Sequence, residues 1–197
     1  WEEFHQILAR YPRERRLILG SAWEVDLEIL RNPRLRDEIL NQKIMVLIVP
    51  HLTGDWPVVK IRELGLTAHL VRAGEPLPAP APGVWVLDLK GVLCELYAHA
   101  GRVYVGGGLG YSVHSVMEPF VAGAEVWCGP QVRRSTEVEL VQSVNPDAIH
   151  ILHNAQEIGE SLERALHDAQ GPDARADWAQ NQIRLSRGSL TQVKGLS

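Results

Sequence analysis

Cysteine is scarce in this chain, and long apolar runs and a strong charge imbalance are absent. The 197 residues include two cysteines, Cys94 and Cys128, without metal-site spacing. This usage favours reduced thiols in a cytosolic compartment over a disulfide framework. No segment reaches the roughly 18 apolar residues of a membrane-spanning helix, and we expect no signal peptide at the charged start. The net charge of −4 argues against a nonspecific nucleic-acid binder.

Motifs of common catalytic centres are also missing. The eight histidines form no His-x-x-x-His or His-Glu-x-x-His pair, so the sequence predicts no metal site. Ser21 stands outside a Gly-x-Ser-x-Gly elbow, which leaves a hydrolase triad unsupported. The chain starts at Trp1 instead of Met, and we therefore expect it to be a fragment of a longer protein.

What the chain does have is a regular alternation of short apolar runs and amphipathic segments. The run 44–49 is wholly apolar, as in a strand covered on both faces. Strands that alternate with helices predict an α/β fold with a Rossmann-like parallel sheet flanked by helices. The predicted strands are 16–20, 44–49, 67–71, 84–87, 103–105, 126–128 and 148–152, and the predicted helices are 1–11, 23–30, 34–40, 56–64, 93–100, 115–122, 135–143, 155–169 and 174–190.

Glycines and polar residues gather where the predicted strands end. The carboxyl ends of parallel strands lie at one edge of a sheet, where doubly wound folds bind their ligands. Glycines there let a backbone approach a ligand closely. The residues concerned are Gly20-Ser21, Pro50-His51, Asp88 with Gly91, Gly106-Gly107-Gly108, His114-Ser115 with Glu118, and Gly129-Pro130.

The segment 103–119 is the most informative of these. An apolar strand stops at three glycines, and His114 and Ser115 open a predicted helix, with Glu118 one turn later on the same face. A helix start offers N–H groups and a positive dipole end to an anion. Ser115 could then donate to a phosphate, and Glu118 could accept hydrogen bonds from two ribose hydroxyls.

The same residues also have ordinary structural interpretations. Three glycines after a strand are more often a tight turn, and the fingerprint Gly-x-Gly-x-x-Gly is absent. His114 alone is more often a cap or a packed side chain, and Glu118 a partner of the helix dipole. Asp88 could be only a turn residue.

These segments resemble the C-terminal domain of bacterial 3-deoxy-D-manno-octulosonic acid (Kdo) transferases, which are glycosyltransferases of the GT-B fold. Residues 106–109, 114–119 and 129–130 are similar to the family's Gly-Gly-(Ser/Gly)-(Leu/Phe), Gly-x-His-Asn-x-Leu-Glu and Gly-Pro segments. Residues 19–24, 49–51 and 88–97 resemble its Gly-Ser-Thr-(Trp/His)-Glu, Val-Pro-Arg-His and Asp-Thr-x-Gly-Glu-Leu-x-x-Leu-Tyr segments. The resemblance covers most of residues 16–170.

The resemblance implies a donor domain that binds CMP-Kdo, with no metal or other cofactor, for transfer of Kdo to a lipid A precursor in lipopolysaccharide biosynthesis. Carried over by position, Glu118 would hold the ribose and Ser115 would contact the nucleotide beside His114. The remaining implied donor-binding residues are Gly107 and Gly108 at the phosphate, Gly20, Ser21, Pro50 and His51 at the border of the interdomain cleft, and Gly91 near the base.

The resemblance also divides the chain into three parts. Residues 1–15 would be a helical linker from an N-terminal domain, 16–172 the nucleotide-sugar-binding domain, and 173–197 a C-terminal helix. The family's catalytic carboxylate, its acceptor contacts and its membrane contacts belong to the N-terminal domain. The chain is therefore expected to hold no catalytic residue, to be inactive alone, and to work in the cytoplasm at the inner face of the bacterial inner membrane.

Two other functions stay open. A GT-B domain that uses a UDP- or GDP-sugar has the same strand–glycine–helix–Glu architecture, and a fold does not fix the substrate. A non-catalytic binding domain of the same fold is the third possibility. It is favoured by His51, Ser115 and Glu125, which stand where the family has Arg, Asn and Pro.

Overall fold

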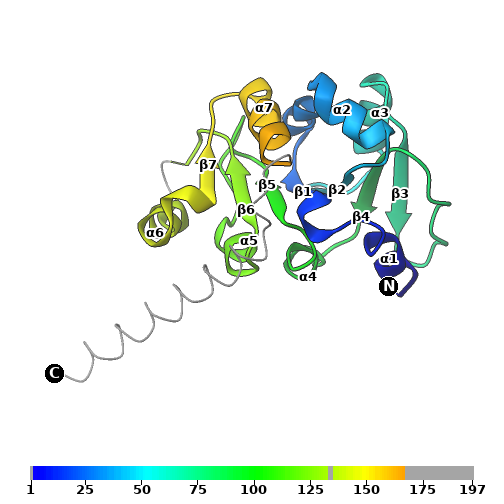
Figure 1. The fold of residues 1–197 in the computed structure, drawn as a ribbon, viewed down its shortest axis with the longest axis horizontal. Coiled ribbons are helices and arrows are strands. Elements are labelled where there is room, and N and C mark those ends of the chain that lie inside the picture. The colour runs from blue at the N-terminus through cyan, green and yellow to red at the C-terminus, as the bar shows by residue number, and fades with distance from the viewer. Residues whose placement is uncertain (1, 133–134, 167–197) are drawn as a thin grey trace.

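The computed structural model describes residues 2–132 and 135–166. Its centre is a seven-stranded sheet of order β3-β4-β2-β1-β5-β6-β7, in which every neighbouring pair is parallel (Figure 1). The strands are β1 (Arg16–Ala22), β2 (Met45–Pro50), β3 (Ala68–Arg72), β4 (Val84–Asp88), β5 (Arg102–Val105), β6 (Glu125–Cys128) and β7 (Ile149–Ile151). The predicted α/β fold with a Rossmann-like parallel sheet is confirmed.

Two sets of helices cover the two faces of the sheet. The α-helices are α1 (Glu2–Leu8), α2 (Pro33–Leu40), α3 (Trp56–Glu63), α4 (Leu93–Tyr97), α5 (Met117–Val121), α6 (Thr136–Val144) and α7 (Ala155–Leu166), and the 3₁₀ helices are η1 (Arg13–Arg15), η2 (Glu24–Arg31) and η3 (Pro146–Ala148). Helices η2, α2, α3 and α7 pack on one face, and α1, α4, α5 and α6 on the other (Figure 1).

The strands feed both layers because successive side chains of a strand point to opposite faces. In β1, Leu17 and Leu19 pack under η2 and α2, whereas Ile18 packs toward α4 and α5. All six residues of β2 are buried, as its continuous apolar run predicts. No helix of the described residues is long and apolar enough to cross a membrane.

Caps fix where several helices begin. The Asn32 side chain accepts a hydrogen bond from the Leu35 N–H at 2.9 Å, with Pro33 in the first turn of α2. The Asn154 side chain likewise accepts a hydrogen bond from the Glu157 N–H at 2.9 Å at the start of α7. The four-residue spacing of Ile158, Leu162 and Leu166 then buries one face of α7.

Two predicted helices differ from the structure. Residues 24–31 form a 3₁₀ helix, because the Asp26 N–H bonds to the Trp23 carbonyl at 3.0 Å while the Asp26 carboxylate accepts from the Trp23 N–H at 2.8 Å. The helix predicted at 115–122 spans only Met117–Val121, so His114 and Ser115 lie in the preceding loop. The predicted helix 174–190 and the end of 155–169 lie outside the described residues.

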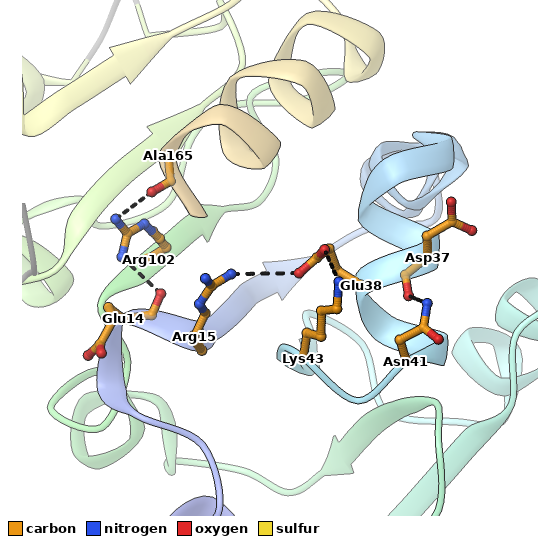
Figure 2. Close-up of polar contacts among 8 residues, drawn as sticks. All are labelled: Glu14, Arg15, Asp37, Glu38, Asn41, Lys43, Arg102 and Ala165. Atoms are coloured by element: carbon orange, nitrogen blue, oxygen red, sulfur yellow. Dashed lines mark hydrogen bonds and ion pairs between the residues drawn. The ribbon is translucent and has the colours of Figure 1, made fainter. Parts of the chain in front are cut away.

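The amino-terminal edge of the sheet is held by one buried guanidinium. Arg102, the first residue of β5, is 1% exposed and donates to the carbonyls of Glu14 at 2.9 Å and Ala165 at 2.7 Å. These bonds join η1 and α7 to the sheet (Figure 2). Beside them, Glu38 of α2 pairs with Arg15 and Lys43 at 3.6 and 3.3 Å.

Helix α1 packs onto the same body. Its Phe4, Ile7 and Leu8 are buried, and the Phe4 ring lies edge-on to Trp85 of β4 at 5.8 Å between centroids. Burial of three apolar side chains contributes on the order of several kcal/mol. Three residues of the segment predicted as a linker, 1–15, thus belong to the packed core; the segment's origin in a preceding domain stays a prediction.

Candidate functional site

The carboxyl ends of β1, β2 and β5 meet where the sheet order changes direction. The His51 N–H donates to the Ala22 carbonyl at 2.9 Å, and the Gly106 N–H donates to the Gly20 carbonyl at 2.8 Å. The ends of β2 and β5 therefore flank the end of β1. Such a switch point is the usual ligand crevice of an open parallel sheet. The structure thus brings together the predicted residues Gly20, Ser21, Pro50, His51, Gly107, Gly108, His114 and Ser115.

The first two glycines of the 106–108 loop let backbone segments touch. A Cβ on Gly106 would lie 2.2 Å from the Ser21 carbonyl oxygen, and one on Gly107 would lie 2.2 Å from the Ser112 carbonyl oxygen. Gly107 also has a φ of +91°, which L side chains rarely adopt. These glycines are thus needed by the packing of the loops, whatever ligand the crevice takes.

The third glycine, Gly108, contacts Gly129 in the loop that follows β6. A Cβ on Gly108 would lie 2.7 Å from the Gly129 nitrogen, and a Cβ on Gly129 would lie 2.3 Å from the Gly108 carbonyl carbon. The Gln131 N–H then donates to the Gly108 carbonyl at 3.0 Å, and the Val113 N–H to the Gln131 carbonyl at 3.2 Å. The loops after β5 and β6 are therefore interlocked.

The end of β1 has an unusual backbone. Ser21 has a φ of +50°, a left-handed conformation that costs a non-glycine residue roughly 1–2 kcal/mol. It lies at an irregularity in the pairing with β2, between Gly20 and Ala22. Gly20 itself faces the Tyr97 hydroxyl, which would lie 2.3 Å from a Cβ placed there. At the floor of the crevice, Ser21 is therefore in a strained conformation and Gly20 packs closely against the Tyr97 hydroxyl.

A buried carboxylate ties the crevice together. Asp26 of η2 is 0% exposed and accepts hydrogen bonds from the Tyr104 hydroxyl at 2.6 Å, the Gly107 N–H at 3.1 Å and the Trp23 N–H at 2.8 Å. Charged acceptors make the stronger hydrogen bonds. One side chain therefore fixes the segment after β1, the strand β5 and the glycine loop.

Four aromatic rings form a stack across the mouth of the crevice. The Tyr111 ring lies on Trp23 at 4.1 Å between centroids, Trp23 on His51 at 4.5 Å, and His51 on His114 at 4.5 Å. The interplanar angles are 23–26°. The Trp23 Nε1–H also points to His114 Nε2 at 3.5 Å. Stacked aromatic pairs each contribute about 0.5–1.5 kcal/mol.

Burial and neighbouring charges shift the titration of this cluster. Burial raises the pKa of Asp26, and hydrogen bonds from Tyr104, Trp23 and Gly107 oppose that rise. Burial also raises the pKa of Tyr104, with the Asp26 charge adding to it. For His114, burial and then the nearby His51 lower the pKa, against a smaller opposite effect of Asp26.

The helix start that was expected to hold a phosphate already has an acceptor. One carboxylate oxygen of Glu137, from α6, accepts hydrogen bonds from the Val116 N–H at 2.9 Å and the Met117 N–H at 3.2 Å. These are the N–H groups at the start of α5. Ser115 lies before the first turn of α5, and the expected binding of an anion at this helix start stays a prediction.

A small hollow remains beside this capped helix. It has a volume of about 270 Å³ and is open to solvent, and its lining is mostly hydroxyl-bearing. The residues that line it are Ser112, Val113, His114, Ser115, Ser135, Thr136 and Glu137.

The other two predicted residues are Glu118 and Gly91. Glu118 is exposed on α5, and the predicted helix face shared with His114 and Ser115 does not form. Its charge adds to burial in raising the pKa of Tyr97. The Tyr97 hydroxyl in turn lies beside Gly20 at the end of β1. Gly91 follows β4, with a φ of +74° and open space where a Cβ would be.

The sequence reasoning missed the residues that organise the crevice. The segment 23–30 predicts an ordinary helix, whereas the Asp26 carboxylate, three residues after Trp23, accepts from the Trp23 N–H as the acid of a capping box does. Tyr111 was treated as part of a loop. Within residues 2–132 and 135–166, no group of three or more His, Cys, Asp or Glu side chains could hold a metal ion.

No family model and no curated protein matches the chain. Among solved structures, the C-terminal CMP-Kdo binding domain of WaaA from Acinetobacter baumannii superposes with a TM-score of 0.72, at 21% identity over 92% of this chain and 95% of that one. The fold is that of a GT-B glycosyltransferase domain.

Two longer proteins of known structure have a similar fold. WaaG, a glycosyltransferase involved in lipopolysaccharide biosynthesis, has a TM-score of 0.55 at 15% identity, over 91% of this chain and 45% of WaaG. The trehalose-6-phosphate synthase OtsA has a TM-score of 0.53 at 10% identity, over 92% of this chain and 42% of OtsA. This GT-B chain therefore spans less than half the length of both.

Proposed function

We propose that this chain is the donor domain of a Kdo transferase-like glycosyltransferase. It binds the cytidine nucleotide of CMP-Kdo, and the full-length enzyme transfers Kdo to a lipid A precursor. The acceptor and the membrane contact a preceding domain, and the reaction takes place on the cytoplasmic side of the inner membrane. The role of this half is to position the donor and to stabilise the departing phosphate.

The observation that carries the proposal is the crevice at the carboxyl ends of β1, β2 and β5. It lies at the switch point of the sheet, where a nucleotide binds in folds of this kind. The similar WaaA domain is named for binding CMP-Kdo. The sequence segments that resemble Kdo transferases, including residues 20–21, 50–51 and 106–115, converge on the same crevice.

A nucleotide panel tests the proposal. Titrations with CMP, UDP, GDP and AMP, followed by calorimetry or NMR, should show a preference for CMP. Glu118→Ala should weaken CMP binding if Glu118 holds the ribose, whereas Glu139→Ala, exposed on α6, should not. Binding without preference for CMP, or an unchanged affinity in Glu118→Ala, would remove the assignment.

Each of the two alternative functions, a UDP- or GDP-sugar transferase domain and a non-catalytic binding domain, is favoured by one observation. A similar structure from E. coli, described as trehalose-6-phosphate, was solved bound with UDP-2-fluoro glucose, and a preference for UDP or GDP in the panel would favour that donor class. The Gly107 and Val116 N–H groups are already bonded to Asp26 and Glu137. Failure to bind any nucleotide would favour a non-catalytic binding domain.

A further inference from the structure

Two histidine rings meet in the crevice. His51 follows β2 and is exposed, and His114 lies in the loop after β5 and is half-buried. Their ring centroids are 4.5 Å apart and their planes differ by 25°. Because the two residues come from separate strands, only the tertiary fold pairs them.

The hydroxyl-bearing surroundings of the pair suit an oxyanion. His114 lines the 270 Å³ hollow together with the hydroxyls of Ser112, Ser115, Ser135 and Thr136. Hydroxyl and imidazole N–H groups donate to phosphate or sulfate oxygens. Neither the lysines nor the arginines of the described residues contribute to the lining of this hollow or to the four-ring stack. Among the described residues that line this hollow, His114 is the side chain that can gain a positive charge, by taking up a proton.

The geometry around His114 favours its neutral form. The Trp23 Nε1–H points at His114 Nε2, and this contact needs an unprotonated Nε2 with its lone pair. Burial and the adjacent His51 lower the pKa of His114 in the same sense. Two protonated rings at this distance would also repel each other, so the pair accommodates one added proton better than two.

Several other titratable groups face the pair. Asp26 of η2 raises the pKa of His114, but its oxygens are taken by Tyr104, Gly107 and Trp23. The Tyr111 phenol stacks on Trp23. Glu137 of α6 lines the hollow with one oxygen bonded to two N–H groups. An arriving anion therefore meets fixed negative charges, which a proton on the histidine pair would offset.

We propose that the His51–His114 pair binds a phosphate oxyanion and takes up one proton from solvent as it does so. The proton lies on the pair, and no covalent bond other than this N–H is formed. The anion's charge stabilises the imidazolium, which then gives up the neutral contact to Trp23. This proposal rests on the proposed function, because the phosphate meant here is that of the sugar nucleotide. It makes donor affinity fall as the pH rises through neutrality.

Calorimetry on the full chain tests this proposal with two probes whose own charge is constant between about pH 5.5 and pH 8, sulfate and the methyl ester of CMP. Titrations in buffers of different ionisation heat give the number of protons taken up. We expect uptake approaching one proton per probe near pH 7.5, and an affinity that falls about tenfold per pH unit above the histidine range.

Variants separate the pair from other histidines. His51→Gln and His114→Gln should each reduce both affinity and proton uptake, and His51→Arg should restore affinity while removing most of the pH dependence. His99→Gln is the matched control, because the His99 ring contacts His5 at 5.0 Å between centroids, a second pair of histidine rings. It should behave as the parent chain.

The outcomes are distinguishable. If the CMP ester binds without proton uptake, or if uptake persists in both Gln variants, this proposal fails and the donor function stands. If sulfate and the CMP ester bind equally well, both with proton uptake, the histidine site stands and the cytidine assignment fails. If neither probe binds at any pH, both are refuted.

Discussion

Replacing Asp26 should have the largest effect on stability of any single change in the crevice. Asp26→Ala leaves the Trp23 N–H, the Gly107 N–H and the Tyr104 hydroxyl without their acceptor. Each buried polar group that loses its partner costs about 1–3 kcal/mol, so we expect a loss of about 3–5 kcal/mol. That is a large share of the roughly 5–15 kcal/mol that stabilises a typical domain.

Asp26→Asn should be much milder. The amide oxygen can keep the two N–H bonds, and the amide NH₂ can donate to the Tyr104 oxygen. We expect a loss of about 1 kcal/mol. Asp37→Asn is the matched control, since Asp37 is exposed on α2 (Figure 2), and it should change stability by less than about 0.5 kcal/mol.

The comparison between the parent chain and Asp26→Asn also has a predicted pH dependence. Burial raises the pKa of Asp26 in the folded state, so its protonation favours the folded state. That contribution is complete below the ordinary pKa of aspartate, about 3.9, and is lost as the pH rises through the folded-state value. The stability of the parent relative to Asp26→Asn should therefore increase as the pH falls from about 7 to about 4.

Urea unfolding followed by tryptophan fluorescence at several pH values measures these differences. A loss below about 1 kcal/mol in Asp26→Ala would show that the three donors find other partners. A parent chain that loses stability relative to Asp26→Asn on acidification would refute the argument from burial.

Three further predictions concern the loops and the amino-terminal edge. Glu137→Ala should cost about 1–2 kcal/mol and speed hydrogen exchange at the start of α5, whereas Glu139→Ala should do neither. Gly106→Ala should cost more than about 2 kcal/mol in a denaturant titration because its Cβ would meet a carbonyl oxygen at 2.2 Å, whereas Gly110→Ala, with its nearest contact at 3.6 Å, should be near neutral. Arg102→Met should cost about 2–3 kcal/mol and speed exchange in α7, because two backbone carbonyls lose their donor.

Equal stabilities within either matched pair would contradict the packing and capping arguments. Unchanged exchange in α7 after Arg102→Met would mean that α7 is held by its apolar face alone.

The fold could be predicted because its signals are local. Five of the strands, β1, β2, β4, β5 and β6, hold a short apolar run that ends at a glycine, proline or acid, and all seven strands appear in the sheet within a few residues of their predicted positions. The convergence of Gly20, His51 and Gly107 could be predicted as well, since parallel strands present their carboxyl ends at one edge.

The side-chain contacts inside the crevice could not be predicted from local sequence patterns. The start of α5 is set by Glu137, which belongs to a different helix, so local spacing placed the helix start too early. The four-ring stack joins Trp23, His51, Tyr111 and His114 from three separate segments. Ring contacts of that kind depend on the tertiary neighbours of each residue and leave no periodicity in the sequence.

The contact between Gly108 and Gly129 has a consequence for how this chain can vary. Each residue occupies the volume that a side chain on the other would need, so the two positions form a single constraint shared by two strands. A mutation at either one is not rescued by a smaller residue at the other, because both are already the smallest residue available. Sequence drift in this region is therefore confined to the outer parts of the two loops, and the crevice keeps its backbone shape while the side chains around it change.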